Sequence, residues 1–235
     1  MVVFQNSKYL DFLSKFGVGG AHPGGINLTK AIFKTEQVSK ASHILDVGCG
    51  TGQTAAFLAS NYGAKVMGID INSIMVAKAK KRMKKTHLPV TIMQGSIEKM
   101  PLPDRKFDFI IAESVLSFVN KPSALKEIFR LLKDGGRFIA IEFTINRQLE
   151  AKTEQEIKQF YGFDSFFMKK DWVALFKQVG FKNIRIQKNK FISSVPEYQY
   201  SKDIEPEHYE LMEKHYDLNL KYEGILDYRV YSCTK

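Results

Sequence analysis

The feature that most limits how this chain can fold is a regular alternation of short apolar runs and amphipathic stretches between His43 and Val179. Runs with the composition of buried strands cover residues 43–47, 65–70, 90–95, 107–113 and 137–143. Stretches with helical spacing separate them, and repeated strand–helix–strand units build a mostly parallel sheet. Two later segments, residues 183–189 and 226–234, alternate in polarity as edge or antiparallel strands do. We therefore expect the α/β class, with a doubly wound, mostly parallel seven-stranded sheet and helices on both of its faces.

Capping residues indicate where several of the helices begin and end. Asn72 or Ser73 is placed to cap the helix that follows the second strand. Gly63 and Gly180 follow helical stretches and are typical of helix C-termini. Asp134–Gly136 is a further signal of this kind, and it predicts the end of the helix that precedes the fifth strand.

Three regions fall outside the alternation, and we interpret them as additions to a single domain that spans residues 1–235. Residues 1–40 precede the first strand, residues 144–170 follow the fifth, and residues 191–224 separate the last two. Ligands of open parallel sheets bind at the carboxyl ends of the strands, so additions there can cover a site. We expect an N-terminal lid from the first region and insertions beside the site from the other two.

Composition excludes several classes of protein. Apolar residues make up 44% of the chain, which is enough to form a core. No stretch approaches the about 20 apolar residues of a membrane span, and the N-terminus is too polar for a secretory signal. The chain has only two cysteines, so no disulfide framework is indicated and we expect a cytoplasmic protein.

The net charge of +10 raises the question of an anionic partner. Six of the eight residues in the run Lys78–Lys85 are basic, and none is aromatic. A phosphate-binding patch normally interleaves aromatic side chains, so this run favours the solvated face of a surface helix. A nucleic acid partner is therefore the less favoured alternative, and the oligomeric state stays open.

A glycine-rich turn follows the first strand in the segment "HILDVGCGTGQTAAFL", residues 43–58. Gly48, Gly50 and Gly52 stand between an apolar strand and a helix. Each glycine costs backbone entropy, so three together predict that a ligand comes close to the backbone. A dinucleotide fingerprint would need another glycine at position 53, which is Gln53. The spacing is Gly-x-Gly-x-Gly instead, and Asp46 lies two residues before it.

Four ordered segments resemble the class I S-adenosylmethionine-dependent methyltransferases. They are "LDVGCGTG" (45–52), "GIDIN" (68–72), "GSIEKMPLPDRKFDFIIAESVLSFV" (95–119) and "RLLKDGGRFIAIEF" (130–143). The details are nearest to the small-molecule branch, which includes the ubiquinone- and menaquinone-type C-methyltransferases. The resemblance implies a Rossmann-like fold and an enzyme that uses S-adenosylmethionine as its cofactor.

The resemblance also implies roles for residues at the strand ends. Asp70 suits hydrogen bonds to the two ribose hydroxyls of the cofactor, and Asp46 suits its methionine ammonium. Gly48, Gly50 and Gly52 are expected to let the backbone approach the amino-acid part and the ribose.

Further cofactor contacts are implied in the neighbouring loops. Ile71 is expected to cover one face of the adenine, and Ser96 and Ile97 to meet it from the loop after the third strand. The family often has Asp where this chain has Ser96, which weakens that contact. Glu113 ends the fourth strand and faces either the cofactor region or a structural hydrogen-bond partner. Cys49 belongs to the cofactor turn as a small filler.

His22, in a stretch with four nearby glycines, is the candidate catalytic residue. Imidazole gains and loses a proton near neutral pH, so a histidine in the lid can act as a general base. The alternative is a loop histidine that caps the helix expected over residues 26–38. His208 and His215 have no third ligand nearby, so no metal site is predicted.

Sequence signals exclude some methyl acceptors. Residues 113–116 read "ESVL" where enzymes that methylate exocyclic base amines carry Asn/Asp-Pro-Pro-aromatic, and neither cysteine follows a proline as cytosine C5 methylation requires. We therefore expect a small organic acceptor, with residues 144–170 and 191–224 on the acceptor side. An RNA methyltransferase and a non-catalytic cofactor-binding homologue are the alternatives. The aromatic run 160–168 predicts a lid over the acceptor or a helix packed on the core.

Overall fold

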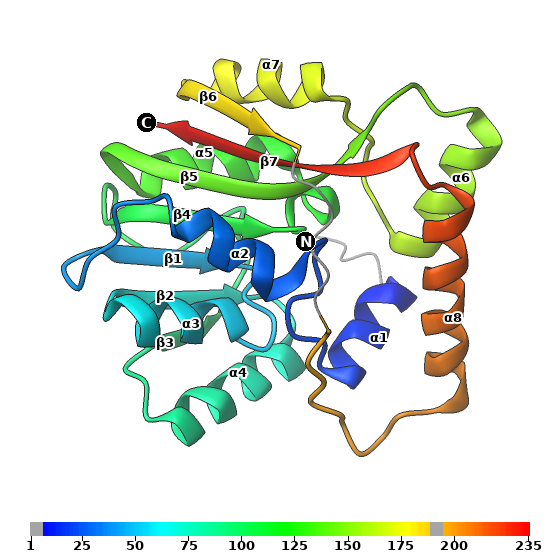
Figure 1. Cartoon of the computed structure of the whole chain (residues 1–235), viewed down its shortest axis with the longest axis horizontal. Coiled ribbons are helices and arrows are strands. Elements are labelled where there is room, and N and C mark those ends of the chain that lie inside the picture. Colours follow the sequence, from blue (N-terminus) through cyan, green and yellow to red (C-terminus); the bar gives the residue numbers. More distant parts are fainter. Residues whose placement is uncertain (1–6, 189–194) are drawn as a thin grey trace.

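The computed structural model describes residues 7–188 and 195–235, which form a seven-stranded sheet with helices on both faces (Figure 1). The strands are β1 (His43–Val47), β2 (Lys65–Asp70), β3 (Thr91–Gln94), β4 (Phe107–Glu113), β5 (Leu132–Ile145), β6 (Lys182–Gln187) and β7 (Leu226–Thr234). Their order across the sheet is β3-β2-β1-β4-β5-β7-β6. Strands β1 to β5 pair in parallel, and β7 runs antiparallel between β5 and β6. The predicted fold class is confirmed.

Helices bury both faces of the sheet. One face carries α2 (Gly25–Phe33), α3 (Gln53–Tyr62) and α4 (Ser73–Thr86), and the other carries α5 (Lys121–Leu131) and α7 (Lys169–Val179). The central strand β4 shows the consequence, because Ile110 packs into the core on one face and Ile111 into the core on the other, both fully buried. A strand covered on both sides needs a continuous apolar run, which is why this segment lacks polar alternation.

The other described helices form a cap beyond the carboxyl ends of the parallel strands (Figure 1). The cap consists of α1 (Lys8–Phe16), α6 (Ala151–Tyr161) and α8 (Pro206–Lys221), and the short 3₁₀ helix η1 (Leu116–Phe118) lies in the loop after β4. Phe16 of α1, Phe160 of α6 and Leu218 of α8 are buried together in a hydrophobic core that belongs to the cap and is rich in aromatic side chains. The expected lid and the two insertions therefore meet in one layer.

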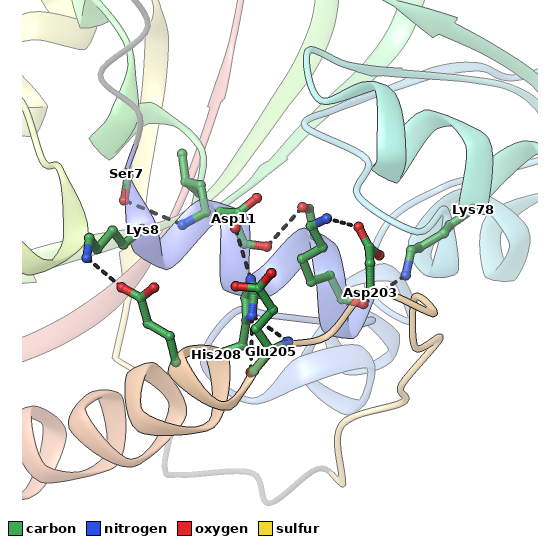
Figure 2. Close-up of polar contacts among 11 residues, drawn as sticks. Ser7, Lys8, Asp11, Lys78, Asp203, Glu205 and His208 are labelled. Carbon is green, nitrogen blue, oxygen red and sulfur yellow. Dashed lines mark hydrogen bonds and ion pairs between the residues drawn. The ribbon is translucent and has the colours of Figure 1, made fainter.

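Polar contacts orient α1 against the first turn of α8 (Figure 2). Asp11 Oδ2 lies 3.1 Å from His208 Nε2, and Lys8 Nζ lies 2.5 Å from Glu207 Oε1. Exposed ion pairs contribute little free energy, so burial of the aromatic side chains holds the cap together and the pairs align it.

Three predicted helix ends are confirmed. Asn72 caps α4 by accepting hydrogen bonds from the backbone amides of Ile74 and Met75. Gly63 and Gly180 follow α3 and α7 in left-handed conformation.

One predicted helix end is wrong. The helix α5 ends at Leu131, before the predicted stop at Asp134–Gly136. Leu132 is extended and fully buried, and it already pairs with Phe107 of β4. The polar glycine segment therefore lies inside an early, irregular part of β5, which is longer at both ends than the strand expected over residues 137–143.

Some expectations fall outside the described residues, namely residues 1–6 of the lid, residue 189 of the sixth strand and residues 191–194 of the second insertion. Within residues 7–188 and 195–235, no helix has both the length and the apolar composition needed to cross a membrane. The same ranges contain no group of three or more His, Cys, Asp or Glu side chains that could hold a metal ion.

Candidate active site

Three carboxylates gather at the carboxyl ends of neighbouring strands: Asp46 on β1, Asp70 on β2 and Glu113 on β4. Asp46 is only 2% exposed, and its side chain accepts a hydrogen bond from the backbone amide of Ala55 in the first turn of α3. Its Oδ2 is buried without a hydrogen-bond partner in the described part of the chain. Burial raises the pKa of Asp46 well above its usual range, and the charges of Glu113 and Asp70 raise it further. A cation bound here would relieve both effects.

The three glycines of the turn after β1 are explained by different neighbours. Gly48, Gly50 and Gly52 all have left-handed φ, of 68°, 51° and 74°. A Cβ on Gly48 would lie 2.3 Å from Val115 Cγ2, and one on Gly52 would lie 2.7 Å from Met83 Cε. A Cβ on Gly50 would meet no atom of the described residues within 4 Å. The chain's own packing thus explains two of the glycines, and Gly50 is the position where a ligand can reach the backbone.

Asp70 connects the end of β2 to this turn. Its Oδ2 accepts a hydrogen bond from Gly50 N at 2.8 Å, and its Oδ1 accepts one from Asn72 N at 2.8 Å. Burial raises the pKa of Asp70, although these hydrogen bonds oppose the shift. Each carboxylate oxygen has another lone pair, so Asp70 can still accept hydrogen bonds from a ligand diol.

The other predicted cofactor residues differ in exposure. Ile71 is 38% exposed, which is unusual for a large apolar side chain and leaves it free to cover a ligand. Ser96 uses its hydroxyl to accept a hydrogen bond from the backbone amide two residues later. Ile97 is buried in the core, so its side chain packs beneath the loop. Cys49 is also buried, burial raises the pKa of its thiol, and its Sγ fills the space against Gly68, as expected of a filler.

Glu113 is the centre of a buried polar network that includes His22. Its Oε1 accepts a hydrogen bond from the Thr29 hydroxyl at 2.5 Å, and its Oε2 accepts one from the Thr54 hydroxyl at 2.6 Å. His22 Nε2 lies 3.4 Å from Glu113 Oε2, and its Nδ1 lies 3.2 Å from the carbonyl oxygen of Pro23. Among the described residues, the His22 ring contacts Pro23 O, Thr29 Oγ1 and Glu113 and no backbone amide of α2, so the helix-capping alternative for His22 is wrong. The network ties the N-terminal segment to the end of β4.

A fourth buried acid, Glu142 on β5, is missed by reasoning from the sequence. It is fully buried, and its Oε1 accepts hydrogen bonds from the backbone amides of Val115 at 3.0 Å and Leu116 at 2.9 Å. Burial raises the pKa of Glu142 to about 7. Because Val115 packs on Gly48, Glu142 holds the loop after β4 over the glycine turn. Its only sequence signal is a single acid within the apolar strand "FIAIEF".

Two cations of the basic run on α4 turn inward. Arg82 Nε donates a hydrogen bond to the carbonyl oxygen of Thr51 at 2.8 Å, and its guanidinium lies 2.9 Å from Glu197 of the second insertion. Lys78 donates to the backbone carbonyl of Gln199. The exposed members of the run are Lys80, Lys81, Lys84 and Lys85. The interpretation as a solvated face therefore fits those four lysines and is wrong for Lys78 and Arg82, which brace the insertion.

Comparison with known proteins decides the family. Residues 38–191 match a family model described as a methyltransferase domain. The chain belongs to this methyltransferase family. An uncharacterized methyltransferase of Bacillus subtilis, YodH, is 35% identical over 97% of the chain and 100% of its own length. The prediction of a class I S-adenosylmethionine-dependent methyltransferase, and hence of an enzyme, is confirmed.

The methyltransferase is also similar to proteins whose names state a reaction. The ubiquinone/menaquinone biosynthesis C-methyltransferase UbiE of Chromobacterium violaceum is 31% identical over 66% of the chain and 62% of its own length. Phosphoethanolamine N-methyltransferase 2 of Haemonchus contortus, solved with S-adenosylhomocysteine, matches 100% of the chain and 58% of its own with a TM-score of 0.79 and 18% identity. The [4+2]-cyclase SpnF matches 97% of the chain and 92% of its own with a TM-score of 0.71 and 18% identity. At such identities the structural matches show the fold alone.

Proposed function

We propose that this methyltransferase transfers the methyl group of S-adenosylmethionine to a small organic acceptor held beneath the cap of α1, α6 and α8. The observation that carries the proposal is the buried Oδ2 of Asp46, which has no partner among the described residues and belongs to a cluster of three acids, one of which, Asp70, bonds to Gly50 in the glycine turn. S-adenosylmethionine carries an ammonium and a sulfonium, and a group of that charge relieves the repulsion among the acids. When bound, it supplies a methyl group already activated for displacement.

Each residue at the strand ends has a role in this proposal. Asp46 accepts a hydrogen bond from the ammonium, and Asp70 accepts from the ribose hydroxyls while keeping its bonds to the turn. Ile71 covers one face of the adenine, and Ser96 and Ile97 supply the loop on its other side, Ile97 through its backbone. The exposure of Ile71 and the remaining lone pairs of Asp70 support these roles.

Calorimetric titration with S-adenosylhomocysteine tests the cofactor site. We expect Asp70→Ala to weaken binding at least about tenfold, the loss of more than one hydrogen bond to a charged group. Asp134→Ala is the matched control, because Asp134 is exposed and lies near the amino end of β5, whereas the proposed site lies at the carboxyl ends of the strands. Absence of binding to the wild-type protein at about 100 μM, a weak affinity for a cofactor, would contradict the proposal.

A groove on the acceptor side supports a small acceptor. Its volume is about 920 Å³, and it opens between α1, α6 and the loop after β4. Phe118 and Phe163 line it with rings 5.1 Å apart. Phe118 follows Glu113 by five residues, so one wall of the groove belongs to the loop that begins at the end of β4. A cavity of this size and partly aromatic lining accommodates a small molecule, and we propose it as the entry of the acceptor.

Filling the groove separates acceptor entry from cofactor binding. Ala151 lines it on the first turn of α6, and Ala151→Trp should block methyl transfer from isotope-labelled cofactor to acceptors in a metabolite extract. Binding of S-adenosylhomocysteine should be unchanged. Ala174→Trp, at an exposed position of α7, is the control. Unchanged transfer by Ala151→Trp would remove the groove from the acceptor path.

We propose a positioning role for His22 in place of the general base. Both of its ring nitrogens face acceptors, Glu113 Oε2 and the carbonyl oxygen of Pro23, and the side chain is nearly inaccessible. An imidazole held in this way orients Glu113 and fixes the N-terminal segment. An acceptor that releases a proton would then pass it to Glu113 or to water.

The named relatives and the surface charge bear on the class of acceptor. The names of UbiE and of the phosphoethanolamine enzymes give small molecules, which supports a small acceptor here. The exposed lysines of α4 keep RNA as the alternative, and binding that falls steeply with salt in a filter assay would favour it. Both cysteines are buried and free, which supports a reducing compartment such as the cytoplasm.

A further inference from the structure

Gln53, the first residue of α3, carries a second buried acceptor without a partner. Its Oε1 is buried and forms no hydrogen bond with any residue that the structure describes. Its Nε2 donates to Glu197 Oε2 at 2.8 Å. An ionised carboxylate only accepts, so this bond determines which end of the amide faces Glu197. The carbonyl oxygen of Gln53 therefore points away from Glu197 and lies beside Gly19 and Gly20. A Cβ on Gly20 would lie only 2.9 Å from this oxygen.

This oxygen lies on the same helix end as the unpartnered oxygen of Asp46. Gln53 and Ala55 belong to the first turn of α3, and the amide of Ala55 donates to the carboxylate of Asp46. Two buried acceptors that lack donors in the described part of the chain thus lie at one helix N-terminus, which directly follows the turn in which Gly50 borders open space. Buried acceptors normally receive a hydrogen bond, so two acceptors without a donor point to a ligand group that only donates.

We propose that Gln53 Oε1 accepts a hydrogen bond from the α-ammonium of the cofactor and shares this group with Asp46. An ammonium has three N–H donors and no acceptor, so it can donate to both oxygens, whereas a carboxylate would be repelled by both. Glu197 acts through Gln53 and is a positioning residue. Because Glu197 lies in the second insertion, the insertion that covers the acceptor side also sets the grip on the cofactor. The inference rests on the proposed function.

A comparison of two ligands tests the assignment. S-adenosylhomocysteine carries the α-ammonium, and 5′-methylthioadenosine has the same nucleoside and sulfur but no amino-acid tail. In calorimetry, Gln53→Met should raise the Kd of S-adenosylhomocysteine about tenfold, as expected for one hydrogen bond to a charged group, and leave that of 5′-methylthioadenosine within twofold. Gln178→Met, at an exposed position of α7, should change neither Kd.

A second variant tests the positioning role without altering Gln53. Glu197 is 42% exposed, so Glu197→Gln should fold, and its amide can donate as well as accept, which frees Gln53 to turn over. We expect a threefold to tenfold rise in the Kd of S-adenosylhomocysteine alone.

The outcomes distinguish failure of the proposed function from failure of the role assigned to Gln53. A wild-type protein that binds neither ligand would refute the proposed function itself. Wild-type binding of S-adenosylhomocysteine with an unchanged Kd in Gln53→Met, or an equal loss for both ligands, would overturn the assignment of Gln53 and leave the proposed function standing.

Discussion

Two glycines of the same turn lead to opposite predictions when each is replaced by alanine. Gly48 and Gly50 both have left-handed φ, so either substitution costs about 1 to 2 kcal/mol in backbone strain. Only Gly48 is crowded, because its added Cβ would lie 2.3 Å from Val115 Cγ2. Forcing one carbon into a packed site costs about 1 to 3 kcal/mol more. We expect Gly48→Ala to lower the free energy of unfolding by about 2 to 5 kcal/mol, and Gly50→Ala by about 1 to 2 kcal/mol.

Urea unfolding and calorimetry measure the two effects separately. The unfolding midpoints report the loss of stability, and titration with S-adenosylhomocysteine reports the loss of ligand space. Gly50→Ala places a methyl group in the open region, so its Kd should rise at least about tenfold, whereas folded Gly48→Ala should stay within about threefold of wild type. Equal losses of stability, or a larger loss of affinity in Gly48→Ala than in Gly50→Ala, would contradict the assignment of Gly48 to packing and of Gly50 to ligand space.

Three further predictions concern buried polar groups. Glu142→Gln keeps an acceptor for the two amides but removes the titrating group, whose pKa burial raises from 4.5 to about 7. The free energy of unfolding of wild type relative to this variant should therefore be highest below pH 4.5 and fall by about 3 kcal/mol as the pH rises to 7. Urea unfolding at several pH values would show this fall. Arg82→Ala should lower the free energy of unfolding by about 1.5 to 3 kcal/mol, because it loses charged hydrogen bonds to Thr51 and Glu197. Lys81→Ala, at the exposed neighbouring position, should lower it by at most about 0.5 kcal/mol, and equal losses would contradict the bracing role of Arg82. His22→Ala should weaken binding of S-adenosylhomocysteine severalfold and also slow turnover, because Glu113 loses its neighbour; slower turnover at unchanged affinity would support the general base instead.

The parts of the fold that depend on local signals could be predicted from the sequence. The strands around the glycine turn follow from apolar runs, and Asn72, Gly63 and Gly180 act within a few residues of where they stand. Asp134–Gly136 shows the limit of such signals. A glycine pair after a helix normally ends it, but burial of Leu132 against β4 starts the strand earlier than the local pattern indicates.

The candidate site shows the same division. Asp46 and Asp70 could be predicted because they stand at the ends of strands next to the glycine turn. Glu142 and Arg82 could not, because the backbone groups that they bind lie 26 or more residues away and only the folded chain brings them together. A glycine in a sequence does not reveal what occupies the space of its missing side chain. Val115 occupies it at Gly48, whereas at Gly50 the space is open to a ligand.

The order of strands has a consequence for how the protein is made. In the sheet, β6 contacts β7 alone, and β7 is also the neighbour that covers the outer edge of β5. On the ribosome β6 emerges first, and the whole second insertion must follow before β7 arrives. During that interval two unpaired strand edges coexist in one nascent chain, so premature pairing of β6 with β5 competes with the correct arrangement.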